Sequence, residues 1–234
     1  MHHLIRNFSY AFKDFLFLST CLHCTAPLRD GEQRVCQKCW DSLSVVSEHD
    51  HTFRVLSKRF SDGGVIDELV SLYYFEKRGL LQTLAHSLKY DEGTMVGIEL
   101  GRRLSARLIR SGADAVIPVP LNKRKERERG YNQSDCIGDG IAERLGIPVF
   151  KQAVCRIKYT VTQTHLNAEE RKQNIAEAFS VARPDLIRGK CVAIVDDVIT
   201  TGSTIQELAK VLRDAGAVRI IAASVGLAKL ERGE

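Results

Sequence analysis

Alternating blocks of apolar and amphipathic sequence set out the architecture of this chain. Four short apolar runs predict buried strands, at residues 69–74, 115–119, 191–195 and 218–225. Apolar residues at helical spacing predict helices at residues 77–89, 95–109 and 203–215. Because strands that alternate with helices are typical of a parallel sheet covered by helices, the pattern predicts an α/β fold.

The segments between these blocks are more polar. Residues 41–62 are of mixed polarity, and we expect a connection with weak strand content there. Residues 158–171 form a long polar segment without a clear period, and loops of that length are uncommon unless functional. The other interpretation is a surface loop that leads into a helix at residues 168–176, with Asn167 as its N-cap. Both interpretations stay open.

Length and charge place broad limits on the function. The chain has 234 residues, enough for a sizeable core in one or two domains. Its net charge of +5 fits an anionic ligand or nucleic acid and does not decide between them. Lys13 and Asp14 interrupt the apolar residues near the N-terminus, so that stretch does not resemble a signal peptide or a membrane span. We expect a cytoplasmic protein without membrane insertion.

Four of the seven cysteines form two Cys-x-x-Cys pairs near the N-terminus. The pairs are Cys21 with Cys24 and Cys36 with Cys39, and eleven residues separate them. Each pair can present two thiolates from one turn, and two pairs complete a tetrahedral site for Zn²⁺. A redox function would need only a single pair, and a disulfide framework would need an oxidising compartment. The spacing therefore predicts a structural zinc site rather than four unrelated thiols.

The apolar run at residues 191–195 leads into two acids, a hydroxyl-rich turn and a helix. Asp196 and Asp197 follow the run, and two adjacent carboxylates suit sugar hydroxyls and a hydrated Mg²⁺. Free backbone N–H groups at the start of the next helix can hold a phosphate, and Gly202 permits close approach of a ligand. An ordinary strand, turn and capped helix is the alternative, but capping does not call for two acids at the end of a buried strand.

These residues resemble the phosphoribosyl pyrophosphate (PRPP) motif of type I phosphoribosyltransferases. The resemblance implies that Asp196 and Asp197 have the catalytic role of meeting the ribose 2′- and 3′-hydroxyls, directly or through Mg²⁺. It also implies that the 5′-phosphate is held by a loop of five residues, which are Thr200, Thr201, Gly202, Ser203 and Thr204.

Cationic residues gather in the loop that we expect after Pro120. Residues 123–129 hold five cations and two acids. Alone, such a run is usually a solvated helix face or a weak nucleic-acid patch. At the carboxyl end of a strand, and beside a PRPP-like motif, it is suited to a pyrophosphate. We therefore expect contacts to the pyrophosphate, or within its loop, from Lys125, Arg129, Asn132 and Gln133.

Further blocks are similar to the ComF/GntX-type phosphoribosyltransferase-like proteins. These are residues 118–121 (PVPL) and residues 129–133 (RGYNQ), where Tyr131 replaces the usual Phe, followed by a polar block at residues 156–179. Those proteins also carry two Cys-x-x-Cys motifs near the N-terminus. The resemblance implies a zinc ribbon within residues 1–48 and a type I phosphoribosyltransferase domain, with a Rossmann-like parallel sheet, over residues 49–234. Residues 49–90 would be a hood or connecting element.

The resemblance implies an enzyme that transfers phosphoribosyl from PRPP to an acceptor and releases pyrophosphate. No residue identifies the acceptor, and residues 158–171 would correspond to a mobile flap over the site. The alternative is a non-catalytic accessory protein of natural competence that binds single-stranded DNA or other competence proteins. Aromatic residues make up only 7% of the chain, so a base-stacking platform is not evident.

Overall fold

The computed structural model describes residues 20–88, 93–157 and 178–230. The long polar segment at residues 158–171 and the helix expected at residues 168–176 lie outside these ranges. Within them, the strands are β1 (Glu68–Phe75), β2 (Ala115–Pro118), β3 (Val154–Arg156), β4 (Phe179–Val181), β5 (Cys191–Ile199) and β6 (Arg219–Ala228). The helices are α2 (Gln37–Asp41), α3 (His51–Asp62), α4 (Leu80–Ser87), α5 (Gly93–Leu108), α6 (Lys123–Arg129), α7 (Gln133–Leu145), η1 (Pro184–Leu186) and α9 (Ser203–Asp214).

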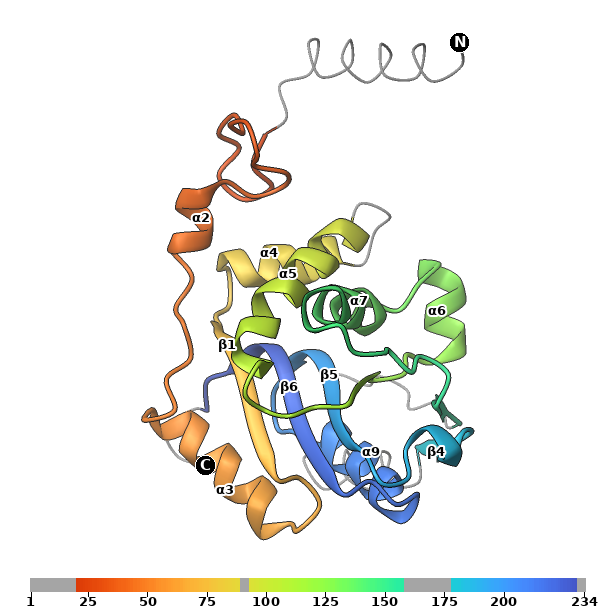
Figure 1. Ribbon diagram of the computed structural model, residues 1–234. Coiled ribbons are helices and arrows are strands. Elements are labelled where there is room, and N and C mark those ends of the chain that lie inside the picture. The colour runs from red at the N-terminus through yellow and green to blue at the C-terminus, as the bar shows by residue number, and fades with distance from the viewer. Residues whose placement is uncertain (1–19, 89–92, 158–177, 231–234) are drawn as a thin grey trace, which may run out of the picture.

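Four parallel strands form the central sheet, in the order β1–β6–β5–β2 (Figure 1). Each of the four predicted strands belongs to it. Strand β5 lies inside the sheet, paired with β6 on one side and β2 on the other. Strands β3 and β4 form a separate antiparallel pair. The predicted parallel α/β fold is confirmed.

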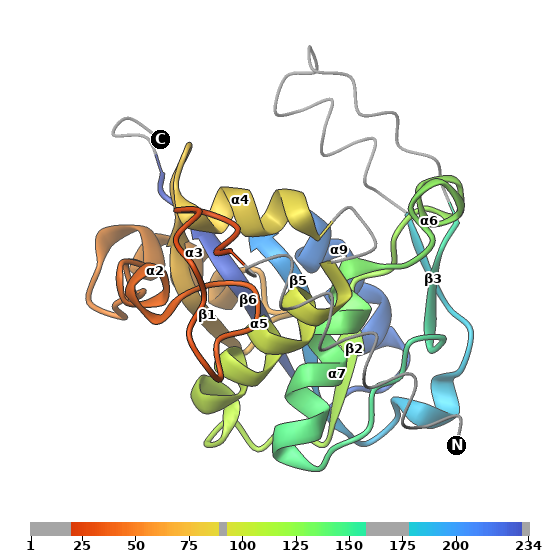
Figure 2. The same ribbon diagram turned by 90° about the horizontal axis from the view of Figure 1, so that it is seen from above.

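Helices cover both faces of this sheet (Figures 1 and 2). Successive residues of β5 point to opposite faces, so Ala193 and Val195 join one apolar cluster while Val192 and Ile194 join the other. The first cluster includes buried residues of α4, α5 and α7, and the second includes those of α3 and α9. Because both faces are buried, β5 is apolar without interruption from Cys191 to Val195.

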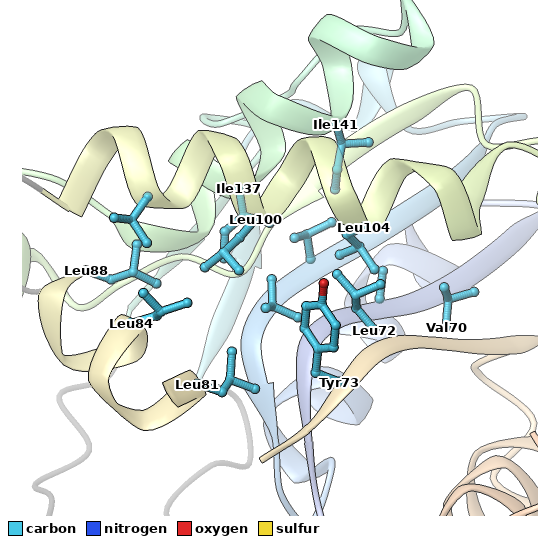
Figure 3. Packing of buried hydrophobic residues seen from close by; sticks show 14 of the residues in the cluster. Val70, Leu72, Tyr73, Leu81, Leu84, Leu88, Leu100, Leu104, Ile137 and Ile141 are labelled. Atoms are coloured by element: carbon cyan, nitrogen blue, oxygen red, sulfur yellow. The ribbon is translucent and has the colours of Figure 1, made fainter. Parts of the chain in front are cut away.

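Helices α5 and α7 pack against each other at very short range. A Cβ atom on Gly101 of α5 would lie 2.0 Å from the carbonyl oxygen of Ile137, and one on Gly140 of α7 would lie 2.0 Å from that of Ile98. Figure 3 shows leucines of α4 and α5 in one apolar cluster with two isoleucines of α7. The glycines thus let the two backbones touch, which fixes α7 over the sheet.

Residues 41–62 differ from the prediction. Instead of weak strand content, residues 51–62 form helix α3. The side chain of Asp50 caps this helix by accepting a hydrogen bond of 2.8 Å from the Thr52 backbone N–H. Leu56 and Phe60 lie one turn apart and are fully buried. Three polar residues between them obscured this short apolar stripe, whose burial stabilises the helix.

The basic segment and β5 also differ in detail from the prediction. The segment expected as a loop after Pro120 contains the helix α6, none of whose residues is buried. Asn122 caps it by accepting a hydrogen bond of 2.9 Å from the Arg124 backbone N–H. Strand β5 continues to Ile199, so the two adjacent aspartates lie within the strand rather than after it.

The N-terminal cysteine element, residues 20–42, packs against α5 and belongs to the same apolar cluster as α4 and α5. Trp40 is buried, and the guanidinium carbon of Arg103 in α5 lies 3.9 Å from the centroid of its ring. Further along, the Val46 backbone N–H donates to the Leu72 carbonyl at 3.0 Å, which covers the outer edge of β1. Across the described ranges, none of the helices is long and apolar enough to cross a bilayer.

Candidate functional site

A cavity of about 210 Å³ opens where β2 ends beside β5. Seven residues predicted for the site line it, namely Lys125, Arg129, Asn132, Gln133, Asp196, Asp197 and Thr204. Ser134 and Arg156, which the sequence analysis did not assign to the site, line it too. Strands β2 and β5, helices α6, α7 and α9, and the end of β3 thus converge on one space.

The cavity exists because two neighbouring strands end at different levels. The last residue of β2, Pro118, pairs with Val195 of β5, and the Val119 backbone N–H donates to the Val195 carbonyl at 2.9 Å. Strand β5 continues beyond this point along β6, where Asp196 pairs with Ser224. The side of β5 that β2 leaves uncovered is therefore the side that borders the cavity.

The two carboxylates at this step sit in a tight hydrogen-bond arrangement. Oδ1 of Asp196 accepts from the Asp197 backbone N–H at 2.9 Å and from the Ser134 hydroxyl at 3.3 Å. Oδ1 of Asp197 accepts from the Val198 backbone N–H at 2.7 Å. Burial, and then the charge of Asp197, raise the pKa of the Asp196 carboxyl well above its usual range. Both residues keep some solvent contact, so the carboxyl groups remain open to a ligand.

Helix α6 and the start of α7 form the cationic wall of the cavity. Gly130, at φ +84°, ends α6 in the left-handed conformation and lets the chain turn into α7. Lys125 and Arg129 lie one turn apart on α6, so both reach the cavity from the same side. Within the described part of the chain, Nη1 of Arg129 is buried and makes no hydrogen bond. A buried guanidinium nitrogen without a partner is suited to an anionic ligand.

Three consecutive buried polar residues, Asn132, Gln133 and Ser134, join this wall to the carboxylates. The Asn132 side-chain amide donates to the Val119 carbonyl at 3.1 Å and to Asp135 at 2.8 Å. Its oxygen accepts from the Ser134 backbone N–H at 3.3 Å and so caps α7. Asn132 therefore links the end of β2 to α7 while it also lines the cavity, and its expected place at the pyrophosphate stays a prediction.

Arg156 brings a third cation to the cavity from the end of β3. Its guanidinium lies 5.5 Å from the ring centroid of Phe179, its partner across the β3–β4 pair. Burial lowers the pKa of Arg156, while the nearby charge of Asp196 raises it. In the sequence, Arg156 begins the polar block at residues 156–179 that resembles the family, and only the three-dimensional fold brings it beside Asp196.

Residues 200–204, called here the threonine loop, connect β5 to α9. Thr204 lines the cavity, whereas Thr200, Thr201, Gly202 and Ser203 are not among its lining residues. Gly202 is the N-cap residue of α9 at φ +78° and has no side chain to cap the helix, while Oγ1 of Thr201 accepts from the Ser203 backbone N–H at 3.5 Å. The Thr201 and Ser203 hydroxyls lie 3.0 Å apart in a mutual hydrogen bond. The first N–H groups of α9 thus begin at the rim of the cavity.

A second cluster lies in the cysteine element. The sulfur atoms of Cys21, Cys24, Cys36 and Cys39 all lie within 4.8 Å of one another, so the cluster could hold a metal ion. Burial opposes ionisation of Cys21, but the backbone N–H groups of Cys24 and Cys36 outweigh it and lower its pKa to about 6. The cluster therefore favours at least one thiolate at neutral pH.

A separate cavity of about 170 Å³ lies between the cysteine element and α5. Arg102 and Arg103 line it, but Arg103 pairs with Glu99 at 2.9 Å and Arg102 pairs with Glu143 at 2.8 Å. Its charges are therefore largely balanced within the protein. None of the residues predicted for the sugar-phosphate site lines it, which leaves the cavity at β5 as the candidate site.

The raised pKa of Asp196 predicts a pH-dependent gain in stability for Asp196→Asn. The folded protein holds this proton to higher pH than the unfolded chain, so wild-type stability falls as pH rises above the usual range of an aspartate. An asparagine has no such dependence. We expect the ligand-free variant to unfold at a higher temperature than wild type at pH 8, with a smaller difference at pH 5.

Asp185→Asn is the matched control. Asp185 is exposed, and its hydrogen bond with Arg183 lowers its pKa, so this variant should gain nothing at pH 8. Thermal melts of the three proteins at the two pH values make the comparison. An Asp196→Asn protein no more stable than wild type at pH 8 would contradict the assigned environment of the carboxyl.

Comparison with known proteins shows what the chain is similar to. The family model for the phosphoribosyl transferase domain matches residues 138–233. Glutamine PRPP amidotransferase from B. subtilis, a solved structure, shares 27% identity with a TM-score of 0.39, covering 56% of this chain and 27% of that chain.

Two curated relatives align over longer stretches. DNA utilization protein YhgH of Salmonella typhimurium is 35% identical over 147 residues, which span 60% of this chain and 64% of that protein. Competence protein F of Haemophilus influenzae is 33% identical over 210 residues, which span 86% of this chain and 81% of that protein. The chain therefore belongs to the competence protein F family and carries a phosphoribosyl transferase domain.

Proposed function

We propose that the cavity beside β5 binds PRPP and that the protein transfers phosphoribosyl to an acceptor. The observation that carries this proposal is the convergence on one cavity of two carboxylates, a cationic helix and the open N-terminus of α9. Each matches one part of the ligand. The ribose lies against Asp196 and Asp197, the 5′-phosphate lies on the threonine loop, and the pyrophosphate lies toward α6.

The charges of the cavity favour a polyanion. Lys125, Arg129 and Arg156 bring three cations, and Asp196 and Asp197 bring at most two negative charges. The raised pKa of Asp196 reduces the negative charge further in the absence of a ligand. A ligand with several phosphate charges would supply the partner that the buried Nη1 of Arg129 lacks within the described residues.

The same carboxylates fit Mg²⁺ as a companion of PRPP. Two adjacent carboxylates offer the hard oxygen ligands that this ion prefers. The repulsion that raises the pKa of Asp196 would be relieved by a divalent cation. When bound, Mg²⁺ neutralises part of the negative charge that develops on the leaving pyrophosphate.

In the proposed reaction the bond between ribose C1 and the pyrophosphate oxygen breaks, and its electron pair leaves with pyrophosphate. A lone pair of the acceptor forms the new bond to C1. The sugar is electron-poor at the transition state, so the carboxylates of Asp196 and Asp197 stabilise it, while Arg129 and Lys125 hold the leaving group. The chain's contribution is positioning and charge, and the acceptor is not specified by the described residues.

The names of two relatives support a proposal for the setting of this chemistry. One is named a competence protein and the other a DNA utilization protein. We place the protein in the cytoplasm, acting on nucleotide or DNA material during uptake and reuse of DNA.

PRPP with Mg²⁺ should raise the thermal unfolding midpoint of the wild-type protein. At a free ligand concentration of 100 Kd the gain is about 2.7 kcal/mol in unfolding free energy. We expect the double variant Asp196→Asn/Asp197→Asn to abolish this rise in the unfolding midpoint, because it removes the contacts to the ribose and to Mg²⁺. A screen for pyrophosphate release with candidate bases then tests turnover.

The exposed variant Asp185→Asn is again the control and should keep the full shift. Equal protection of the wild type and the double variant by PRPP would show that the ligand binds elsewhere. Absence of any protection in the wild type would remove the proposed function.

We further propose that the cysteine cluster binds structural Zn²⁺. A Zn–S bond of about 2.3 Å in a tetrahedron puts sulfur atoms about 3.8 Å apart. The Sγ atoms of Cys24 and Cys36 are 3.7 Å apart, which fits this geometry. Because Cys21, Cys36 and Cys39 share an apolar cluster with α4 and α5, the ion would also anchor the element to the core.

Purified protein should therefore contain about one zinc ion per chain. Cys24→Ser should lower that content toward zero and lower the thermal midpoint. Cys155→Ser, which alters a half-buried cysteine outside the cluster, should do neither. Elemental analysis and thermal melts measure both effects. A wild-type protein that folds fully without metal, or zinc retained in Cys24→Ser, would contradict the assignment.

A second candidate function is binding of single-stranded DNA, and helix α6 favours it. Three exposed cations lie on this helix, namely Lys123, Arg124 and Arg127. Because none of the residues of α6 is buried, these side chains can contact the phosphates of a DNA strand. Changing these three to Ala spares the cavity residues Lys125 and Arg129. We expect the dependence of log affinity on log salt to flatten by about 2 if three phosphate contacts are lost.

Fluorescence anisotropy with a labelled oligothymidine measures this slope. PRPP protection of the same triple variant should stay at the wild-type level. Wild-type protein that shows no salt-dependent DNA binding, or an unchanged slope in the triple variant, would exclude α6 as a DNA contact.

A further inference from the structure

Helix α3 packs directly against the threonine loop. The last turn of this helix lies beside residues 201 and 202, about 140 positions further along the chain. Helix α3 also lies outside residues 138–233, which the phosphoribosyl transferase model matches. The contact therefore joins an N-terminal element to the part of the candidate site that would hold a phosphate.

The ring of Phe60 supports Gly202. A Cβ atom placed on Gly202 would lie 2.5 Å from both Cε1 and Cζ of Phe60, so the ring touches the loop backbone itself. Phe60 is only 1% exposed, and Leu56 beside it is fully buried. The left-handed φ of +78° at Gly202 thus occurs against a rigid apolar surface.

Arg59 holds the preceding residue of the loop. Its Nη1 donates to the carbonyl oxygen of Thr201 at 3.5 Å. Neighbouring residues of α3 therefore restrain neighbouring residues of the loop, one by packing and one by a hydrogen bond. The helix is itself fixed at its start, where Asp50 caps it and the Thr52 hydroxyl accepts from the Leu230 backbone N–H at 3.4 Å.

The conformation of Gly202 decides where the N-terminus of α9 points. Gly202 has no side chain to cap α9, and the Ser203 backbone N–H donates instead to Oγ1 of Thr201 in the loop at 3.5 Å. The first N–H groups of α9 therefore depend on the loop for their position. A phosphate held by backbone N–H groups is sensitive to their placement, since a displacement of about 1 Å can cost roughly a hundredfold in a positioned interaction.

We propose that Phe60 and Arg59 are positioning residues that hold the threonine loop ready for a 5′-phosphate before any ligand arrives. This inference rests on the proposed function, because it assigns the 5′-phosphate to the same loop. It adds that the affinity for that phosphate is set by α3, an element that makes no contact with the ligand.

The test uses two probes that separate the parts of the site. Ribose 5-phosphate reports on the threonine loop, and inorganic pyrophosphate with Mg²⁺ reports on the α6 side of the cavity. For Phe60→Leu we expect the Kd of ribose 5-phosphate to rise roughly tenfold while that of pyrophosphate stays unchanged. Phe53→Leu makes the same change on the same helix at a residue half-buried in the same apolar cluster, and should change neither affinity.

Arg59→Met gives a second variant in which the exposed side chain can be changed without opening the core. It should weaken ribose 5-phosphate binding in the same selective way, by a few-fold, whereas Arg54→Met, also exposed on α3, should not. Isothermal titration calorimetry measures the affinities, and thermal melts confirm that each variant is folded. This second pair keeps the test decisive if Phe60→Leu does not fold.

The possible outcomes separate the two levels of the proposal. Selective loss of ribose 5-phosphate affinity in the Phe60 or Arg59 variants, with their controls unaffected, supports the positioning role. Wild-type affinity in both variants, or equal weakening of both probes, overturns it. If the wild-type protein binds neither ribose 5-phosphate nor PRPP, the proposed function fails and this inference fails with it.

Discussion

The candidate site depends on one constraint, which is that two neighbouring strands of the sheet end at different positions. Strand β2 stops at Pro118, opposite Val195, while β5 continues along β6 to Ile199. Two adjacent carboxylates therefore occur in a strand that is half enclosed, where desolvation and mutual repulsion raise the pKa of Asp196. Such an arrangement is costly in an empty protein. Under the proposed function it becomes favourable when cations and hydroxyl groups occupy the space that β2 leaves open.

The rest of the fold places complementary groups around that step. The glycine contact between α5 and α7 fixes α7, whose first residues connect β2 to the carboxylates through Asn132 and Ser134. Helix α6 supplies cations on one side, and α9 begins on the other. Helix α3 supports the loop between β5 and α9. The site is thus assembled from short-range packing of rigid elements, which is the condition for holding several parts of one anion at once.

Local signals in the sequence were enough for part of this picture. The four strands, the aspartate pair and the Cys-x-x-Cys spacing are short-range patterns, so they were visible without a structure. Helix α3 was missed because Leu56 and Phe60 are separated by polar residues and the helix depends on burial. Helix α6 is polar on all sides and carries no periodicity. Ser134 and Arg156 join the site only through tertiary contacts with Asp196.

A diffraction structure of the protein crystallised with PRPP and Mg²⁺ tests the central claim most directly. The account predicts density for the ribose beside Asp196 and Asp197, for the 5′-phosphate at the N-terminus of α9, and for the pyrophosphate beside Arg129. Density for PRPP at any other place, with the step between β2 and β5 filled only by water, would contradict it.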